Sequence, residues 1–202
     1  MMMIGFGLAI PYQIWVTVTR KPIVFSNRLF LWSIMMELIT LAIVLWIARV
    51  RRWPIITLEP RINWRNTLGG ILLFLVTTVA MILVELPLLY LIGSQKSLVT
   101  VNGITLPFII LLSIINPIFE EILEAGYFVH ALERFGMWPT VLASGLLRGI
   151  LHMYQGIGGV IALFTFGAIF ALVYWRWRQL WPLIIAHSLN DFVGLLFLAH
   201  RG

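Results

Sequence analysis

The chain has 202 residues, of which 61% are hydrophobic and only 11% are charged, and its mean hydropathy is +0.99. This composition excludes an ordinary soluble domain and is typical of a membrane protein. Cys is absent, which excludes disulfides, thiolate metal sites and cysteine nucleophiles. The net charge of +6 comes mostly from Arg at the ends of apolar segments, and no basic face with interleaved aromatics indicates nucleic-acid binding.

Apolar segments long enough to cross a membrane follow one another along the whole chain. We expect a single integral membrane domain over residues 1–202, all-α and polytopic, with about seven transmembrane helices. The expected spans are 2–19, 29–48, 68–92, 104–134, 138–153, 157–175 and 180–199. The first is interpreted as a retained span, because its basic residues follow the apolar stretch and a signal peptide has the opposite order.

Segment 104–134 is too long for one simple span. Pro107 and Pro117 divide it, and because proline interrupts helical hydrogen bonding we expect a break or kink before Phe119. A helix that carries three glutamates would follow. Segment 138–153 is short, which suits a helix buried among others.

Residues 49–67 are the one clear polar connection. We expect this linker to lie on the membrane surface, with Trp53 and Trp64 at the headgroups. More Lys and Arg residues fall on its side of the membrane than on the other. The positive-inside rule therefore places the linker and the N-terminus in the cytoplasm, and we expect the plasma membrane of a prokaryote.

Ionisable side chains inside spans are costly in hydrocarbon and are usually functional. In this chain they are Glu37, Glu85, Glu120, Glu121, Glu124, Arg148, His152, His187 and Asp191. For Glu37 and Glu85 we expect a structural role, because no partner set surrounds them in the sequence.

Helical geometry groups most of the others, because residues four apart share one face. The pairs that share a face are Glu120 with Glu124, Arg148 with His152, and His187 with Asp191, with Asn190 at the edge of the last. Three helices thus each present one polar stripe. The economical interpretation is a buried polar site between these three helices.

Glycines accompany two of these stripes. Gly145 and Gly149 form a GxxxG on the face of Arg148, which allows a neighbouring helix to approach closely, and Gly194 lies on the face of His187. Taken singly, each histidine is as often a helix–helix hydrogen-bonding residue as a catalytic one. Together with the acids, the set favours catalysis.

These motifs resemble the CAAX-processing and bacteriocin-protection (CPBP, Abi-type) family of intramembrane endopeptidases. The family signature is EExxxR, then FxxxH, then HxxxN or HxxxD, on three membrane helices. Here it reads EEILEA at 120–125, RGILH at 148–152 and HSLND at 187–191. The resemblance covers about 115–195, within a motif-bearing core of about 104–199.

Two positions depart from the signature. Ala125 stands where the motif has arginine, and Arg148 stands where it has phenylalanine. We expect Arg148 to supply, from the next polar helix, the charge that Ala125 cannot. The predicted contact is a charge-assisted hydrogen bond to Glu121 or Glu124.

The resemblance implies an enzyme that hydrolyses a peptide bond of a membrane-associated peptide or protein with a glutamate-activated water. It implies Glu120 as the base, within the Glu120–Glu121 pair, and His152 as a residue that holds the water. His187, with Asp191, would face the oxyanion. We expect Arg148, Glu124 and Asn190 to support these catalytic residues.

No cofactor is firmly predicted. Two His and one Glu are a known zinc set, so zinc held by His152, His187 and Glu120 is the alternative, although an HExxH motif is absent. The expected partners are membrane lipid and a membrane-associated substrate. Two other functions stay open: a catalytically impaired relative in peptide binding or bacteriocin immunity, which Ala125 favours, and a small proton-coupled transporter.

Overall fold

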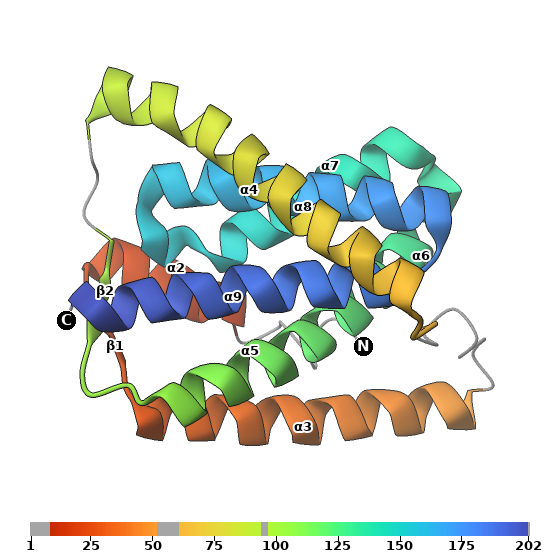
Figure 1. Ribbon diagram of the computed structural model, residues 1–202, viewed down its shortest axis with the longest axis horizontal. Coiled ribbons are helices and arrows are strands. Elements are labelled where there is room, and N and C mark those ends of the chain that lie inside the picture. The colour runs from red at the N-terminus through yellow and green to blue at the C-terminus, as the bar shows by residue number, and fades with distance from the viewer. Residues whose placement is uncertain (1–8, 52–60, 94–96, 202) are drawn as a thin grey trace.

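A computed structural model describes residues 9–51, 61–93 and 97–201 of the chain (Figure 1). Helices account for most of the described chain. The long ones are α2 (Ala9–Thr19), α3 (Asn27–Val50), α4 (Trp64–Ile92), α5 (Leu106–Glu121), α7 (Met137–Leu151), α8 (Gly156–Trp177) and α9 (Trp181–Arg201). Short pieces complete them: a π-helix (Ile122–Val129), α6 (His130–Leu132), 3-10 turns (Glu133–Phe135 and Met153–Gln155), and strands β1 (Ile23–Phe25) and β2 (Val99–Val101).

Five helical segments are long and apolar enough to cross a membrane. They are Asn27–Val50, Trp64–Leu91, Leu106–Phe135, Met153–Trp177 and Trp181–His200. The all-α polytopic class is therefore confirmed, and the chain is an integral membrane protein.

The two other expected spans are not among these five helices of the described chain. Segment 138–153 forms α7, which has 15 residues, and segment 2–19 is described only as the 11-residue α2, since residues 1–8 lie outside the described chain. A helix needs about 20 residues to cross the hydrocarbon. Of the linker 49–67, Trp53 lies outside the described residues, while Trp64 begins α4 and is exposed.

Of the break or kink expected before Phe119, the break is absent, because the helix is continuous there. Pro107 lies in the first turn of α5, where a missing N–H costs nothing, and α5 runs through Pro117 to Glu121. Packing of α5 against α3 and α9 offsets the single hydrogen bond lost at Pro117. The irregularity comes instead directly after the glutamate pair, as the π-helix; such wide turns are rare and often mark functional sites.

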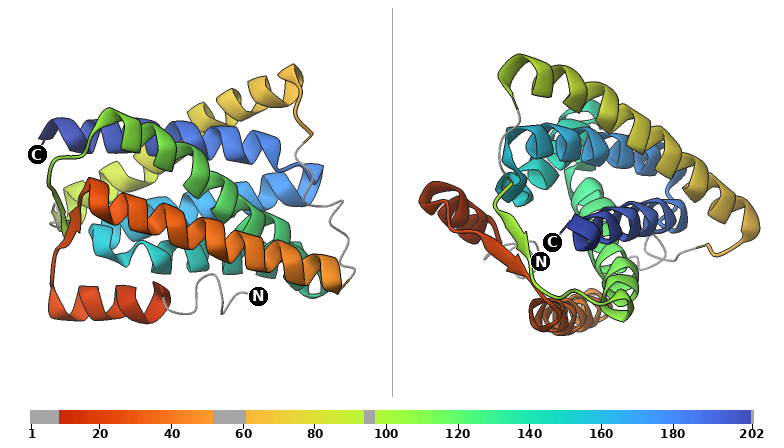
Figure 2. Two further views of the ribbon diagram at one scale, coloured as in Figure 1. Left: turned by 90° about the horizontal axis from the view of Figure 1, so that it is seen from below. Right: turned by 60° about the vertical axis from the view of Figure 1, so that its left-hand side comes forward.

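The helices pack around three apolar clusters, and their arrangement is seen in Figures 1 and 2. α7 and α8 form an antiparallel hairpin, α4 packs across α8 and α9, and α5 lies between α3 and α9. The largest core lies among α4, α8, α9 and the π-helix, and includes Leu73, Val129, Phe166 and Leu183. The strands form a two-stranded parallel sheet at the end of the bundle where α3 and α5 begin.

The GxxxG of α7 packs against α8, as predicted. A Cβ added at Gly145 would lie 2.8 Å from the carbonyl oxygen of Phe164, and one at Gly149 would lie 2.9 Å from that of Val160. Neither distance leaves room for a methyl group. Gly194 differs, because nothing lies within 4 Å of the corresponding position. The close approach therefore belongs to the helix that carries Arg148.

Replacing Gly149 by Ala is expected to lower the free energy of unfolding by about 1–3 kcal/mol, because the methyl group forces α7 away from the Val160 backbone. The matched control is Gly194→Ala, which is expected to leave stability unchanged or to raise it slightly, since Ala is the better helix former. Thermal unfolding of the purified protein in detergent measures both. Equal effects of the two substitutions would show that the tight α7–α8 contact is not a stability determinant.

Candidate active site

Three glutamates enter the interior from the end of α5 and the π-helix that follows it. The side chain of Glu121 is 0% exposed and that of Glu124 is 2% exposed, whereas Glu120 keeps 14% of its side chain exposed. Carboxylates enclosed in this way require partners, because the surrounding side chains are apolar. The three residues differ in the partners that they find.

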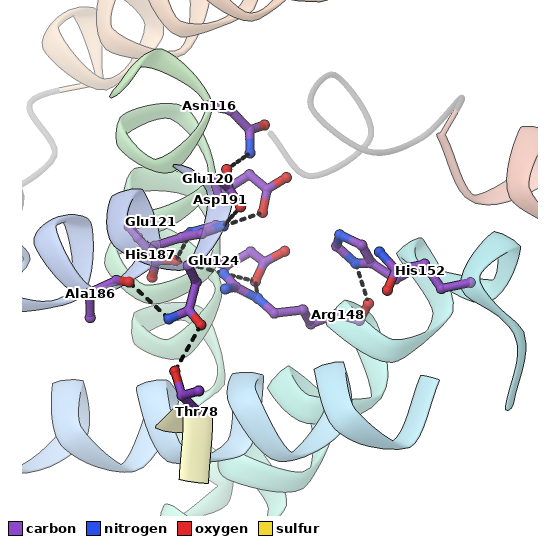
Figure 3. A network of polar contacts seen from close by, with 12 residues as sticks. Thr78, Asn116, Glu120, Glu121, Glu124, Arg148, His152, Ala186, His187 and Asp191 are labelled. Atoms are coloured by element: carbon purple, nitrogen blue, oxygen red, sulfur yellow. Dashed lines mark hydrogen bonds and ion pairs between the residues drawn. The ribbon is translucent and has the colours of Figure 1, made fainter. Parts of the chain in front are cut away.

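Arg148 binds two of the three glutamates (Figure 3). Its Nη2 donates to Glu121 Oε1 at 2.8 Å, and its Nε donates to Glu124 Oε2 at 2.5 Å. The guanidinium is 1% exposed, so these are charge-assisted hydrogen bonds shielded from water, the strong class. The contact that the sequence predicted for Arg148 is present, and it reaches both candidate partners.

An aromatic pair on α8 lies under the Arg148 guanidinium. The guanidinium carbon lies 4.8 Å from the ring centre of Phe166 and 5.5 Å from that of Phe170, within cation–π range. The same rings contact His187 edge-on, at 5.3 and 6.3 Å between ring centres. This aromatic pair was not predicted, although the sequence shows two phenylalanines four residues apart, which places them on one face of a helix.

His187 faces carboxylates on both sides of its ring. Nδ1 lies 2.7 Å from Glu121 Oε1, while Nε2 lies 3.4 Å from Asp191 Oδ1 and 3.8 Å from Glu120 Oε2. The Nδ1 contact is a tight hydrogen bond, and the two Nε2 distances are loose. Nε2 is therefore the nitrogen that is available to a bound molecule.

Asp191 and Asn190 point to different surroundings. Asp191 Oδ2 accepts a hydrogen bond from Asn116 Nδ2 at 3.0 Å, so Asn116, one turn before Glu120 on α5, joins the cluster. The amide of Asn190 instead accepts from Thr78 on α4 and donates to the carbonyl oxygen of Ala186. Among the described contacts, Asn190 makes none to the glutamates that it was expected to support.

His152 caps the C-terminal end of α7. Its Nδ1 lies 2.9 Å from the carbonyl oxygen of Arg148, and because a carbonyl only accepts, this nitrogen donates and Nε2 keeps its lone pair. In Figure 3 its ring lies on the side of α7 that faces the glutamates. Within the described chain, His152 makes no hydrogen bond to Glu120 or His187.

Zinc held by His152, His187 and Glu120 was the alternative that the sequence left open. Within residues 9–51, 61–93 and 97–201, no three His, Asp or Glu side chains are grouped so that they could hold a metal ion. His187 instead contacts carboxylates through both nitrogens, and His152 uses one nitrogen on a backbone carbonyl. These residues, in this arrangement, do not fit a three-ligand metal site.

Residues 102–193 match the family model described as type II CAAX prenyl endopeptidase Rce1-like. The match covers 92 of the 202 residues and shows a similarity to this family. The match extends from the residue after β2 to the middle of α9, and it includes the glutamates, Arg148, both candidate histidines and Asp191. No curated protein and no solved structure matches the chain.

The missing motif arginine has a structural counterpart in this chain. Ala125 is 3% exposed and packs in the same core as Phe166 and Phe170, the rings that lie under the Arg148 guanidinium. The position one turn after Glu121 thus borders the space that Arg148 occupies from α7. A charge delivered from another helix fills the place next to the glutamates.

Proposed function

We propose that this protein is an intramembrane endopeptidase that hydrolyses a peptide bond of a membrane-associated peptide or protein. The observation that carries the proposal is the unequal treatment of the three glutamates. Glu121 and Glu124 are bound by Arg148, whereas Glu120 Oε2 is buried without a hydrogen-bond partner in the described chain. A base must have a free lone pair, and Glu120 is the glutamate that keeps one beside His187.

The chemistry follows from these positions. Glu120 takes a proton from a water molecule while the water oxygen adds to the substrate carbonyl carbon. Because His187 Nδ1 already donates to Glu121, Nε2 carries a hydrogen only in the doubly protonated imidazolium. In that form Nε2, which lies loosely between Asp191 and Glu120, donates to the oxyanion that forms. The C–N bond then breaks, and Glu120 returns its proton to the leaving nitrogen. His152 Nε2 accepts a hydrogen bond from the other O–H of the water and so orients the water molecule.

Arg148 and Glu124 hold the catalytic pair in place in this proposal. Arg148 fixes Glu121, and Glu121 in turn accepts from His187 Nδ1, so one carboxylate oxygen connects the guanidinium to the imidazole. Asp191, held by Asn116, completes the support of His187. Asn190 has a structural role between α9 and α4.

The catalytically impaired alternative depends on Ala125. The absence of the motif arginine is a weaker argument for an inactive protein, because Arg148 contacts the glutamates that the motif arginine would accompany. The transporter alternative draws on the same buried acids and histidines, which also serve proton relays. Cleavage separates the endopeptidase from both alternatives.

The decisive experiment is cleavage of membrane-anchored peptides by the purified full chain in lipid nanodiscs, with products identified by mass spectrometry. The wild type is expected to cut at defined bonds, and Glu120→Gln is expected not to. If neither protein cuts any peptide, the results favour the alternative of a catalytically impaired relative that acts in peptide binding or bacteriocin immunity. If both cut equally, a contaminating protease or another base is responsible.

We also propose that the reaction needs no tightly bound metal. Metal analysis of the purified chain is expected to find zinc well below one per chain, and cleavage is expected to persist in 1,10-phenanthroline. The reason is that His187 and His152 already have other hydrogen-bonding partners. One zinc per chain, removed by the chelator together with activity, would make His152, His187 and Glu120 ligands and would reverse this proposal.

The membrane location remains an expectation. The end of α3, the starts of α4, α7 and α9 and the end of α8 belong to the side that is richer in Arg. We infer that this side, with the N-terminus, is cytoplasmic and that the membrane is the plasma membrane of a prokaryote.

A further inference from the structure

Glu37 on α3 lies on the face of that helix that packs against α5. The buried residues of α3 are Phe30, Ile34, Val44 and Ala48, and Glu37 falls on the same alternating spacing of three and four residues. Such spacing defines one face of a helix. Glu37, for which a structural role was expected from the sequence, therefore lies on the inward face of α3.

The level of Glu37 along α5 follows from the contacts on either side of it. Phe30, two turns earlier, packs in one core with Ile109, and Val44, two turns later, packs in another with Phe119. Glu37 lies midway between these contacts. It is therefore level with the middle of α5, between Ile109 and Phe119, on the stretch that leads to Glu120.

The Glu37 carboxyl group belongs electrostatically to the candidate site. The charged groups that act on it are Glu120, Asp191 and His187. Its Oε2 is buried and has no hydrogen-bond partner in the described chain. Four helical segments, not three, thus bring ionisable groups to the cluster, and Glu37 is the member from α3.

The cluster has more acceptors than donors. Glu121 Oε2 and Glu124 Oε1 also lack a hydrogen-bond partner in the described chain, although both side chains are more than nine-tenths buried. Arg148 Nη1 is the one nitrogen with the same status among the described side chains. The acids are Glu37, Glu120, Glu121, Glu124 and Asp191, and the basic groups are Arg148, His152 and His187. Because unpaired carboxylates are costly in a membrane, a ligand that fits this site supplies N–H donors and positive charge.

We propose that Glu37 binds a positively charged side chain, Lys or Arg, of the peptide that reaches Glu120, and so makes the site selective for basic peptides. The inference rests on the proposed endopeptidase function. Among the five acids, Glu37 is suited to this role because each of the other four forms an ion pair with Arg148 or His187 within the described chain. Arg148 binds Glu121 and Glu124, and His187 lies beside Glu120 and Asp191.

The test measures binding, so that it does not depend on catalysis. Fluorescent apolar peptides, identical except that lysine replaces norleucine at one position at a time, are titrated against the full chain in nanodiscs of zwitterionic lipid. At one or two neighbouring positions, lysine is expected to tighten binding by about tenfold or more, the usual effect of a charged hydrogen-bonding partner. Glu37→Gln is expected to abolish this preference, and Glu37→Asp, which keeps the carboxylate, to retain part of it.

Glu85→Gln is the matched control. Glu85 is also a partly buried glutamate in a spanning helix, but it lies on α4 beside Gly158 at the start of α8. The lysine preference is expected to survive in this variant. Equal binding of lysine and norleucine peptides by the wild type at every position would overturn the proposal, and so would a preference that persists in Glu37→Gln or disappears in Glu85→Gln.

The same samples are assayed for cleavage, which separates the two proposals. Lysine-selective binding without cleavage contradicts the endopeptidase function and leaves the role of Glu37 supported. Cleavage without any preference for basic residues contradicts the role of Glu37 alone.

Discussion

Replacing Arg148 by Ala is expected to lower the free energy of unfolding by about 3–5 kcal/mol and to abolish cleavage. The substitution leaves Glu121 and Glu124 without their shared cation, at side-chain exposures of 0% and 2%. It also empties the space above Phe166 and Phe170. The midpoint of thermal unfolding in detergent reports the loss of stability, and the yield of monodisperse protein shows whether the variant folds at all.

The control for this prediction is Arg178→Ala. Arg178 also pairs with a glutamate, Glu133, but its side chain is 37% exposed and that of Glu133 is 31% exposed. Exposed pairs contribute about 0–1 kcal/mol, so this substitution is expected to change stability little. If Arg148→Ala unfolds no more easily than Arg178→Ala and still cleaves peptides, the glutamates are held by a group other than Arg148.

A double variant tests whether position or charge matters. Arg148→Phe combined with Ala125→Arg restores the family motif and is expected to recover stability and cleavage that Arg148→Phe alone loses. The reason is that Ala125 packs in the same core as Phe166 and Phe170, one turn from Glu121. An arginine at 125 therefore enters the space that the guanidinium of Arg148 vacates. Failure of the double variant to improve on Arg148→Phe would show that the charge must come from α7.

Replacing Glu120 by Gln is expected to reduce the cleavage rate by about 10²–10⁴-fold while stability stays near that of the wild type. Gln keeps the shape of the side chain but cannot take a proton from water. Stability is largely spared because Glu120 forms no hydrogen bond within the described chain and keeps 14% of its side chain exposed. Cleavage rates and thermal midpoints, measured on the same preparation, test the two halves of this prediction.

The variant Glu124→Gln tests whether Glu120, and not Glu124, is the catalytic base. Glu124 Oε2 accepts from Arg148, so its amide variant is expected to lose stability while the folded fraction continues to cleave. The assignment of roles would be wrong if folded Glu124→Gln were inactive and Glu120→Gln cleaved at the wild-type rate.

The sequence predicted contacts best where only one kind of partner could satisfy the residue. Arg148 was the one basic residue buried within the spans of the C-terminal half, so its pairing with Glu121 or Glu124 followed from the cost of unpaired charge in a membrane. The contact of Gly145 and Gly149 with a neighbouring helix was predictable for a similar reason, since small residues at this spacing permit it. The identity of that neighbour, α8, was not.

Two features could not be predicted from single segments. A break or kink was expected at Pro117, but α5, packed on both sides, continues through the proline. Glu37 was expected to have a structural role because no partner set surrounds it in the sequence, and only the structure places it on the face of α3 that packs against α5. In both cases the deciding contact comes from a helix distant in sequence.

The sequence by itself determined the membrane class, the family motifs and which acids and bases needed partners, because burial cost and motif spacing are properties of local segments. Only the tertiary structure decided which glutamate Arg148 leaves free, that Phe166 and Phe170 lie under the guanidinium, and that α3 contributes Glu37. These outcomes depend on the rotation and depth of each helix against its neighbours. Rotation and depth are set by side-chain packing between helices, which no single segment specifies.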